Sequence, residues 1–265
     1  MADSLESGVR RVPILGAVIG WLASPAHWAG SDGIGARVLQ HLALSGTALA
    51  IAVAVAMPLG LYLGHTGKGA LLVINVANAG RALPSLAVLA LVLPLVFRLH
   101  LGLGFWPTVF MLIPLGVPLI LLNCYVALRS VERELLEVAR AMGMREWQVL
   151  REVELPVASL LILAGIRNAA VTIVATATLG ALVASGGLGR YLVDGLARQE
   201  TERLIAGALL VALLSTLTEI GFGLLEQVIV PRGIRHRRHV GQVATQSGTR
   251  LSQLEAAAPQ EHIYA

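Results

Sequence analysis

The sequence contains few charged residues, few aromatic residues and one cysteine. Asp, Glu, Lys and Arg make up 14% of its 265 residues, against roughly 25% for an average soluble domain. With Cys124 as the one cysteine, the chain can build neither an internal disulfide framework nor a cysteine-based metal site. The four Phe, four Trp and four Tyr show no aromatic box for a cation. We therefore expect no metal site.

Long uncharged runs take the place of charge, and hydrophobic residues reach 56%. A helix needs about 20 apolar residues to cross the hydrocarbon core of a bilayer. The sequence therefore predicts an all-α integral membrane protein with five core transmembrane helices, over residues 42–63, 69–97, 105–128, 155–186 and 204–230. The second is expected to bend or break, because Gly80 and Pro84 flank its one charged residue, Arg81.

The three parts of the chain differ in composition. Residues 1–40 form an N-terminal segment whose apolar stretch, 12–31, predicts a short helix lying on the membrane, or else a sixth crossing. Residues 41–231 form the transmembrane domain, and residues 232–265 form a tail that is first basic and then disordered in our interpretation. Two spacings of small residues, Gly60 to Gly64 and Gly165 to Ala169, predict close helix packing.

Basic residues indicate the orientation of the spans. Five spans place eleven Lys and Arg on one side, including Lys68 and the C-terminal tail, and seven on the other. The richer side is predicted to be cytoplasmic, and the C-terminus with it. These charges lie in loops between apolar runs, so we expect no nucleic-acid partner. Four tail residues would contact anionic membrane lipid or simply anchor the last span: Arg232, Arg235, Arg237 and Arg238.

Segment 129–154 holds five Arg and six Glu between two apolar runs, so we expect it to lie in water. Charge alone would also suit a plain connector. Within it, Glu137-Val138-Ala139 precedes Gly143, and Val153-Glu154-Leu155-Pro156 follows. This spacing resembles the EAA signature of bacterial ABC-importer permeases, with Val138 and Val153 as mild departures. The resemblance implies a cytoplasmic coupling loop that docks on an ATPase through Glu137, Ala139, Gly143, Val153, Leu155 and Pro156.

The coupling loop also has a structural pattern of its own. A polar helix over 132–141, ended by Gly143 in a left-handed conformation, and a second short helix over 146–154 would form a helix–turn–helix plug. We expect Ala139 and Gly143 to let the backbone of a partner approach closely. Pro156 suits the first turn of the fourth span.

Two further stretches, Arg81–Ala87 and Ala175–Gly189, resemble permeases for quaternary-amine osmoprotectants: glycine betaine, choline, carnitine and proline betaine. The resemblance covers roughly residues 35–231 and implies a MetI-like fold in the bacterial inner (plasma) membrane. It further implies a second permease chain, identical or paralogous, an extracytoplasmic substrate-binding protein, and two ATPase subunits that hold ATP and Mg. This chain would then be a transport subunit without catalytic residues or a cofactor, and its Gly67-Lys68 lacks the spacing of a P-loop.

Polar residues inside the spans are candidates for the translocation path or gate, because such groups are costly in hydrocarbon. In the second and fourth spans they are Asn78, Arg81, Ser85, Arg167, Asn168, Thr172 and Thr176, and Pro84 joins them because it lies at the expected break. Helix packing is the alternative role for each. Glu219 and Glu226 share one face of the last span, and Glu219 is expected to pair with Arg167 or Arg81.

Two other functions stay open on the sequence alone. One is an importer permease for another small solute, such as methionine or a phosphonate. The other is a transporter or channel that needs no ATPase, which the absence of buried acid pairs and inverted repeats disfavours.

Overall fold

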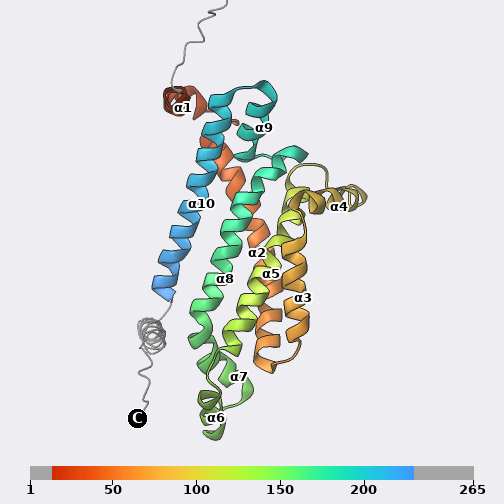
Figure 1. Cartoon of the computed structure of the whole chain (residues 1–265), viewed down its shortest axis with the longest axis vertical. Coiled ribbons are helices and arrows are strands. Elements are labelled where there is room, and N and C mark those ends of the chain that lie inside the picture. Colours follow the sequence, from red (N-terminus) through yellow and green to blue (C-terminus); the bar gives the residue numbers. More distant parts are fainter. Residues whose placement is uncertain (1–13, 230–265) are drawn as a thin grey trace, which may run out of the picture.

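The computed structural model describes residues 14–229, and this range forms helices without any strand. Its long helices run side by side along one axis, as Figure 1 shows. Four helical runs are long and apolar enough to cross a membrane: α2 (Ile34–Thr66), α5 (Phe105–Arg129), the run Glu146–Val183 that contains α8 (Leu155–Thr176), and α10 (Thr201–Ile229). The shorter α3 (Ala70–Ala82) and α4 (Ser85–Arg98) together pass the same test. The predicted all-α membrane fold is confirmed.

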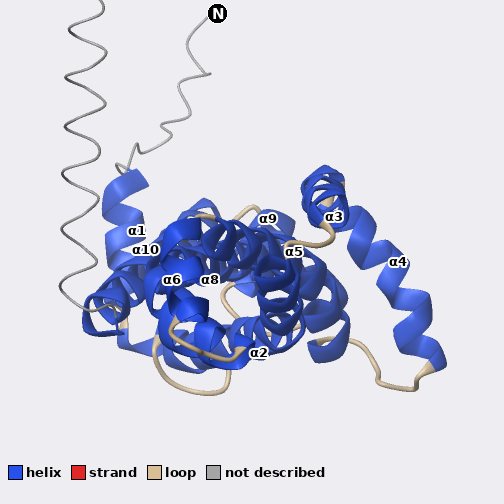
Figure 2. Cartoon of the chain, turned by 90° about the horizontal axis from the view of Figure 1, so that it is seen from below, coloured by secondary structure: helices blue, strands red, loops and turns tan. Residues whose placement is uncertain are grey.

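The α3–α4 pair is bent by 96° between Gly80 and Ser85. Pro84 explains the position of the break, because a proline disfavours helical backbone in the residue before it. Leu83 is accordingly extended, with φ −76° and ψ 118°. Figure 2 shows α4 reaching away from the bundle, whereas α3 stays against it. The second crossing is therefore broken near its middle, as Gly80 and Pro84 predict.

Helix α5 lies at the centre and contacts α2, α3, α4 and α8. Small residues permit the closest of these approaches. A Cβ added to Gly60 would lie 2.6 Å from the Cβ of Cys124, and one added to Gly165 would collide with Asn123. Both predicted spacings of small residues therefore serve helix packing, and Cys124 is a buried core residue.

Short helices close the two ends of the bundle. At one end lie α1 (Ile14–Ala23) and α9 (Gly189–Arg198), and at the other lie α6 (Arg133–Ala141) and α7 (Glu146–Gln148) (Figure 1). Figures 1 and 2 show α1 lying across the long axis. Its 10 residues span about 15 Å, half the hydrocarbon core. Such a helix is too short to cross alone.

Two predicted span boundaries differ from the helices. Helix α2 begins at Ile34 rather than at 42, and it includes Arg37, whose guanidinium bonds Asp32 at 2.5 Å. Helix α8 ends at Thr176, and a 3-10 segment, Ala177–Val183, continues the run predicted to reach 186. Helix α9 was not expected, because its sequence is polar and contains two glycines.

Candidate functional site

The turn after α6 is set by Gly143. Its φ of +84° lies in the left-handed region, where glycine carries no steric penalty. The Gly143 N–H donates to the Arg140 carbonyl at 2.9 Å, and the Met144 N–H donates to the Ala139 carbonyl at 3.2 Å. This pair of bonds is a Schellman motif, which satisfies carbonyls at the end of a helix. The predicted left-handed cap at Gly143 is confirmed.

An ion pair joins α6 to α7 across that turn. Arg140 donates two hydrogen bonds to the Glu146 carboxylate, at 2.9 and 3.0 Å. The hydrogen bond from Arg140 lowers the pKa of the Glu146 carboxyl below its usual value. Gln148 accepts a hydrogen bond from the Arg145 backbone N–H at 2.8 Å and so caps the start of α7. The two short helices thus form one folded unit, as the helix–turn–helix interpretation predicts.

The coupling-loop residues named from the sequence lie in different environments. Glu137 is exposed, whereas Val153, Leu155 and Pro156 are half-buried where the loop enters α8. Ala139 is 2% exposed, so the expectation that it offers a close-approach surface to a partner is wrong. Its methyl group packs inside this chain, because it lies on the inner face of α6. A Cβ added to Gly143 would meet nothing, so that position does face open space.

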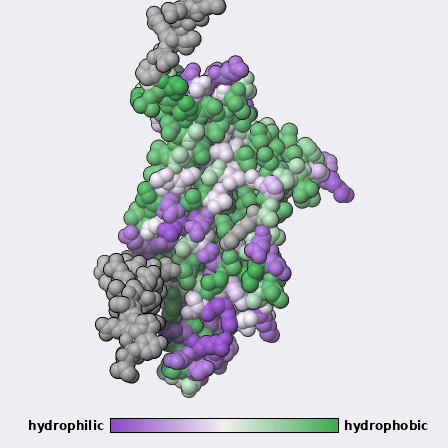
Figure 3. Space-filling view, in the orientation of Figure 1, coloured by the Kyte–Doolittle hydropathy of each residue, from purple (hydrophilic) through white to green (hydrophobic). Residues whose placement is uncertain are grey.

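Apolar side chains project from this otherwise polar end, which Figure 3 shows as hydrophilic surface around α6 and α7. Leu135 and Val138 on α6 and Met142 at its C-cap are exposed, and Trp147 on α7 is 65% exposed. The first three follow helical spacing and share a face. Exposed apolar groups in a water-facing loop mark an interaction surface. This apolar surface was not predicted from the sequence, although apolar residues at positions i, i+3 and i+7 of a polar helix are its signal.

Glu154 contradicts the expectation that the whole segment 129–154 lies in water. It is 2% exposed, and its Oε2 lies 2.6 Å from Nδ1 of His65 at the end of α2. A cavity of about 270 Å³ adjoins the pair and is also lined by Glu137 and Arg140. His65 carried no signal in the sequence that would have linked it to the loop.

The candidate path residues of the second span surround its break. Asn78 and Pro84 are exposed and Ser85 is half-buried. The side chain of Arg81 lies outside what the structure describes. An exposed amide such as that of Asn78 needs a polar neighbour inside a membrane, since hydrocarbon offers none. This surface is therefore suited to a water-filled path or to a second protein chain.

Arg167 is directed toward α10. Its Nε lies 3.3 Å from Glu219 and its NH1 lies 3.4 Å from Glu226. The expected pairing of Glu219 with Arg167 is thus confirmed, and Glu226 joins it. A role in holding α8 to α10 accounts for Arg167, because paired charges are far less costly in a membrane than single ones.

The other polar residues of α8 lie on a different face from Arg167. Asn168 and Thr172 are exposed, and Thr176 is half-buried. The Thr172 hydroxyl donates to the Asn168 carbonyl at 2.8 Å, so that hydroxyl needs no further acceptor. Asn168 and Thr172 remain candidates for lining a path, separately from Arg167.

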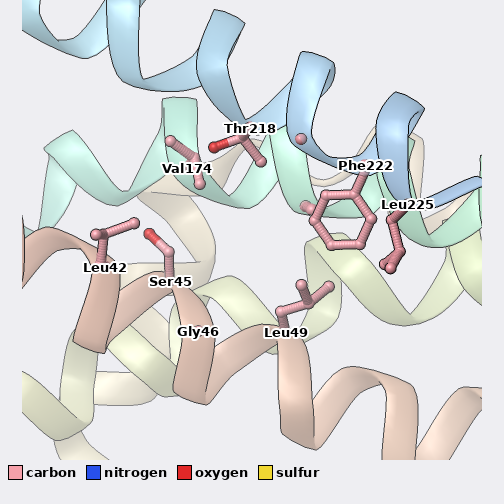
Figure 4. A pocket seen from close by; sticks show the side chains of 10 residues that line it. Leu42, Ser45, Gly46, Leu49, Val174, Thr218, Phe222 and Leu225 are labelled. Atoms are coloured by element: carbon pink, nitrogen blue, oxygen red, sulfur yellow. The ribbon is translucent and has the colours of Figure 1, made fainter. Parts of the chain in front are cut away.

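A cavity of about 400 Å³ lies between α2, α8 and α10 (Figure 4). Leu42, Leu49, Val174 and Leu225 line it, with Phe222 as its one aromatic residue. Among the residues that the structure describes, no charged side chain lines it. The cavity is therefore apolar and unsuited to a charged solute.

A second cavity, of about 500 Å³, lies at the opposite end from α6 and α7. Trp21 and Tyr191 line it, but the Trp21 ring stacks on His27 with centroids 4.1 Å apart. Arg203 lies over the Tyr191 ring at 5.7 Å. One face of each ring is thus already covered, and these rings form no open aromatic cage. Over residues 14–229 no group of three or more His, Cys, Asp or Glu side chains could hold a metal ion.

Comparison with known proteins decides the family. The model of the binding-protein-dependent transport system inner membrane component family matches residues 56–230, which include the broken span, the coupling loop and α8. The chain belongs to this family. It is therefore a multi-pass membrane protein and a transport component, and the resemblance noted in the sequence is confirmed.

Several curated proteins are similar to this chain over most of their length. The carnitine transport permease protein OpuCB of Listeria monocytogenes is 36% identical over 203 residues, which are 77% of this chain and 91% of that protein. The glycine betaine/carnitine/choline transport system permease protein OpuCB of Bacillus subtilis is 36% identical, over 76% of this chain and 90% of that protein. The choline transport system permease protein OpuBB of Bacillus subtilis is 35% identical, over 77% of this chain and 92% of that protein.

A solved structure shares the fold. A chain of the methionine ABC transporter MetNI, in an inward-facing conformation, superimposes with a TM-score of 0.66. The match covers 74% of this chain and 95% of that chain, at 22% sequence identity. This likeness confirms the MetI-like helical arrangement.

The predicted lipid-contacting residues of the tail, Arg232, Arg235, Arg237 and Arg238, lie outside the described residues.

Proposed function

We propose that this chain is the membrane-spanning permease subunit of an ATP-driven importer for quaternary-amine osmoprotectants. The family match over residues 56–230 carries the proposal, together with relatives at 35–36% identity that are named for carnitine, choline and glycine betaine transport. The fold likeness to the methionine transporter does not favour methionine as the cargo, because 22% identity speaks for the fold alone. Membership of a binding-protein-dependent family disfavours an ATPase-independent channel.

In this proposal the α6–α7 end is cytoplasmic and receives the ATPase. Leu135, Val138, Met142 and Trp147 supply an exposed apolar surface there, which binding to a partner would remove from water. Two ATPase subunits hold ATP and Mg, and no step of ATP hydrolysis takes place in this chain. Glu137 and Gly143 remain in the docking loop as exposed positions.

The other end would be extracytoplasmic, with α1 lying at the membrane interface and a substrate-binding protein docking nearby. Selection of the cargo by that protein is consistent with the lack of an open aromatic cage here. A second permease chain, identical or paralogous, would cover the exposed polar groups Asn78, Asn168 and Thr172. The substrate would then pass between the two chains. The C-terminal basic tail would lie on the cytoplasmic side against anionic lipid.

Uptake by the reconstituted importer tests this function. Proteoliposomes that contain this chain, its ATPase and its binding protein should accumulate labelled glycine betaine, choline or carnitine only with ATP. A hydrolysis-dead ATPase should abolish accumulation. Accumulation that persists without hydrolysis would show that the chain is not an ATP-driven permease.

Val138 gives a matched pair of variants for the docking surface. Val138→Asp places a charge on the exposed apolar face and should reduce copurification of the ATPase at least tenfold. Val138→Ala removes little surface and restores the Glu-Ala-Ala of the family signature, so it should copurify the ATPase as the unchanged protein does. Equal copurification by both variants would rule out α6 as the docking surface.

A further inference from the structure

The His65–Glu154 pair is unusual for its burial. Among the buried side chains that the structure describes, Glu154 is the one carboxylate, and it is 2% exposed. Taking a carboxylate out of water is costly unless it is paired and hydrogen-bonded. A carboxylate oxygen accepts hydrogen bonds, so Nδ1 of His65 carries the hydrogen and donates across the 2.6 Å separation. The second ring nitrogen, Nε2, lies 3.5 Å from Glu146.

The pair joins parts of the chain that are 89 residues apart in sequence. His65 lies in the last turn of α2, and Glu154 ends a π-helical turn, Val149–Glu154, that leads from α7 into α8. Glu146–Val183 is one helical run, so a displacement of α7 passes directly to α8. π-Helical turns occur often at functional sites.

A displacement of α7 reaches α2 by a less direct route than it reaches α8. A cavity of about 270 Å³ is lined by both the end of α2 and α6, through Gly64, His65, Leu136 and Arg140. Empty space transmits no force, because its lining atoms have no contact partners. The short hydrogen bond from His65 to Glu154 joins two residues that line this cavity. Helix α2 packs closely on the central α5 through Gly60 and Gly64, so a pull on His65 would also move α5.

We propose that His65 and Glu154 form a latch that transmits movement of the coupling loop to α2. The latch rests on the proposed function, since it needs an ATPase to move the loop. His65 is a positioning residue in this role, because it lies at the end of α2, outside the exposed apolar surface of the loop, and acts through Glu154. Without the latch, the loop would still bind its partner, and α2 would follow it only through its packing against α5 and α8.

Two substitutions at position 65 separate the hydrogen bond from side-chain packing. His65→Gln keeps a side-chain N–H donor, whereas His65→Leu keeps bulk without a donor. In the reconstituted importer, His65→Leu should lower substrate uptake per ATP hydrolysed at least tenfold, and His65→Gln should keep at least half of the original ratio. ATPase copurification should be unchanged for both. A Gln variant as defective as the Leu variant would overturn the latch.

Because His65→Leu leaves a buried carboxylate without its donor, the double variant His65→Ala/Glu154→Ala provides a second measurement. It removes the contact and the charge together, and it should also lose at least tenfold in uptake per ATP. Glu152→Ala is the matched control, since Glu152 is an exposed carboxylate in the same π-helical turn. It should leave the ratio within twofold.

The outcomes distinguish the latch from the proposed function. A double variant with the original uptake per ATP, or a Glu152→Ala variant as defective as the double variant, contradicts the latch alone. Failure of the unchanged chain to copurify the ATPase, or uptake by it without ATP, contradicts the proposed function instead. A double variant absent from the membrane leaves the Gln–Leu comparison to decide.

Discussion

Helices α5 and α10 have similar length and hydropathy, yet the structure uses them differently. They contain 25 and 29 residues with mean hydropathies of 2.2 and 2.0, but the most apolar stretch of α5 is 44% buried and that of α10 is 6% buried. A bilayer is as apolar as a protein core, so hydropathy selects both helices equally. Burial depends on neighbours, which hydropathy does not report.

The contacts of the two helices explain the difference. Helix α5 touches four other long or broken-span helices, whereas α10 touches α8, α9 and α1. The cytoplasmic half of α10, in the proposed orientation, is tied to α8 by Arg167 through Glu219 and Glu226. Packing therefore holds α5, and a few polar contacts hold that half of α10.

Leucine truncation in α5 should have the largest effect on stability. Leu112 is fully buried, so Leu112→Ala should lower the free energy of unfolding by about 2–5 kcal/mol, from lost contacts and the remaining cavity. Unfolding in detergent micelles, followed by circular dichroism against denaturant, measures the change. A loss below about 1 kcal/mol would mean that α5 is not the packing centre.

Loss of the Arg167 ion pairs should have an intermediate effect. Arg167→Gln removes the positive charge opposite two carboxylates, and the Arg167 side chain is 27% exposed, so we expect a loss of about 1–2 kcal/mol. Spin labels on α8 and α10 should also show a broader distance distribution. The triple variant Arg167→Gln/Glu219→Gln/Glu226→Gln should recover most of the stability, because it leaves no unpaired charge.

An equally unstable triple variant would contradict this account of α10. It would show that packing around the three side chains, rather than charge pairing, holds α10 to α8. The α5–α10 difference would then be one of degree, with both helices held by the same kind of contact.

The sequence predicted the spans and several particular contacts. Gly60, Gly80, Pro84 and Gly143 act through local backbone and steric rules, so their roles could be inferred without neighbours. The pairing of Arg167 with Glu219 was one of two expected alternatives, because few opposite charges occur within the spans. Backbone and steric preferences of single residues thus account for the broken crossing, the close helix packing at small residues and the turn in the loop.

Contacts distant in sequence could not be predicted. The burial of Glu154 depends on His65 approaching from another helix, and the burial of Ala139 depends on how α6 folds back onto the π-helical turn. A charge-rich segment predicts exposure for each of its members on average, and tertiary packing decides the exceptions. The docking role of Glu137 and the path roles of Asn78, Asn168 and Thr172 stay predictions.

Leucine truncation in α10 should have the smallest effect. Leu217 is 54% exposed, so Leu217→Ala exchanges lipid contacts for other lipid contacts and should change the free energy of unfolding by less than about 0.5 kcal/mol. The measurement is the same as for Leu112→Ala, its matched partner in α5. If Leu217→Ala instead weakens association of two permease chains in a crosslinking assay, then the exposed face of α10 belongs to an interface between chains. In that case the low burial of α10 would describe the single chain and not the assembled importer.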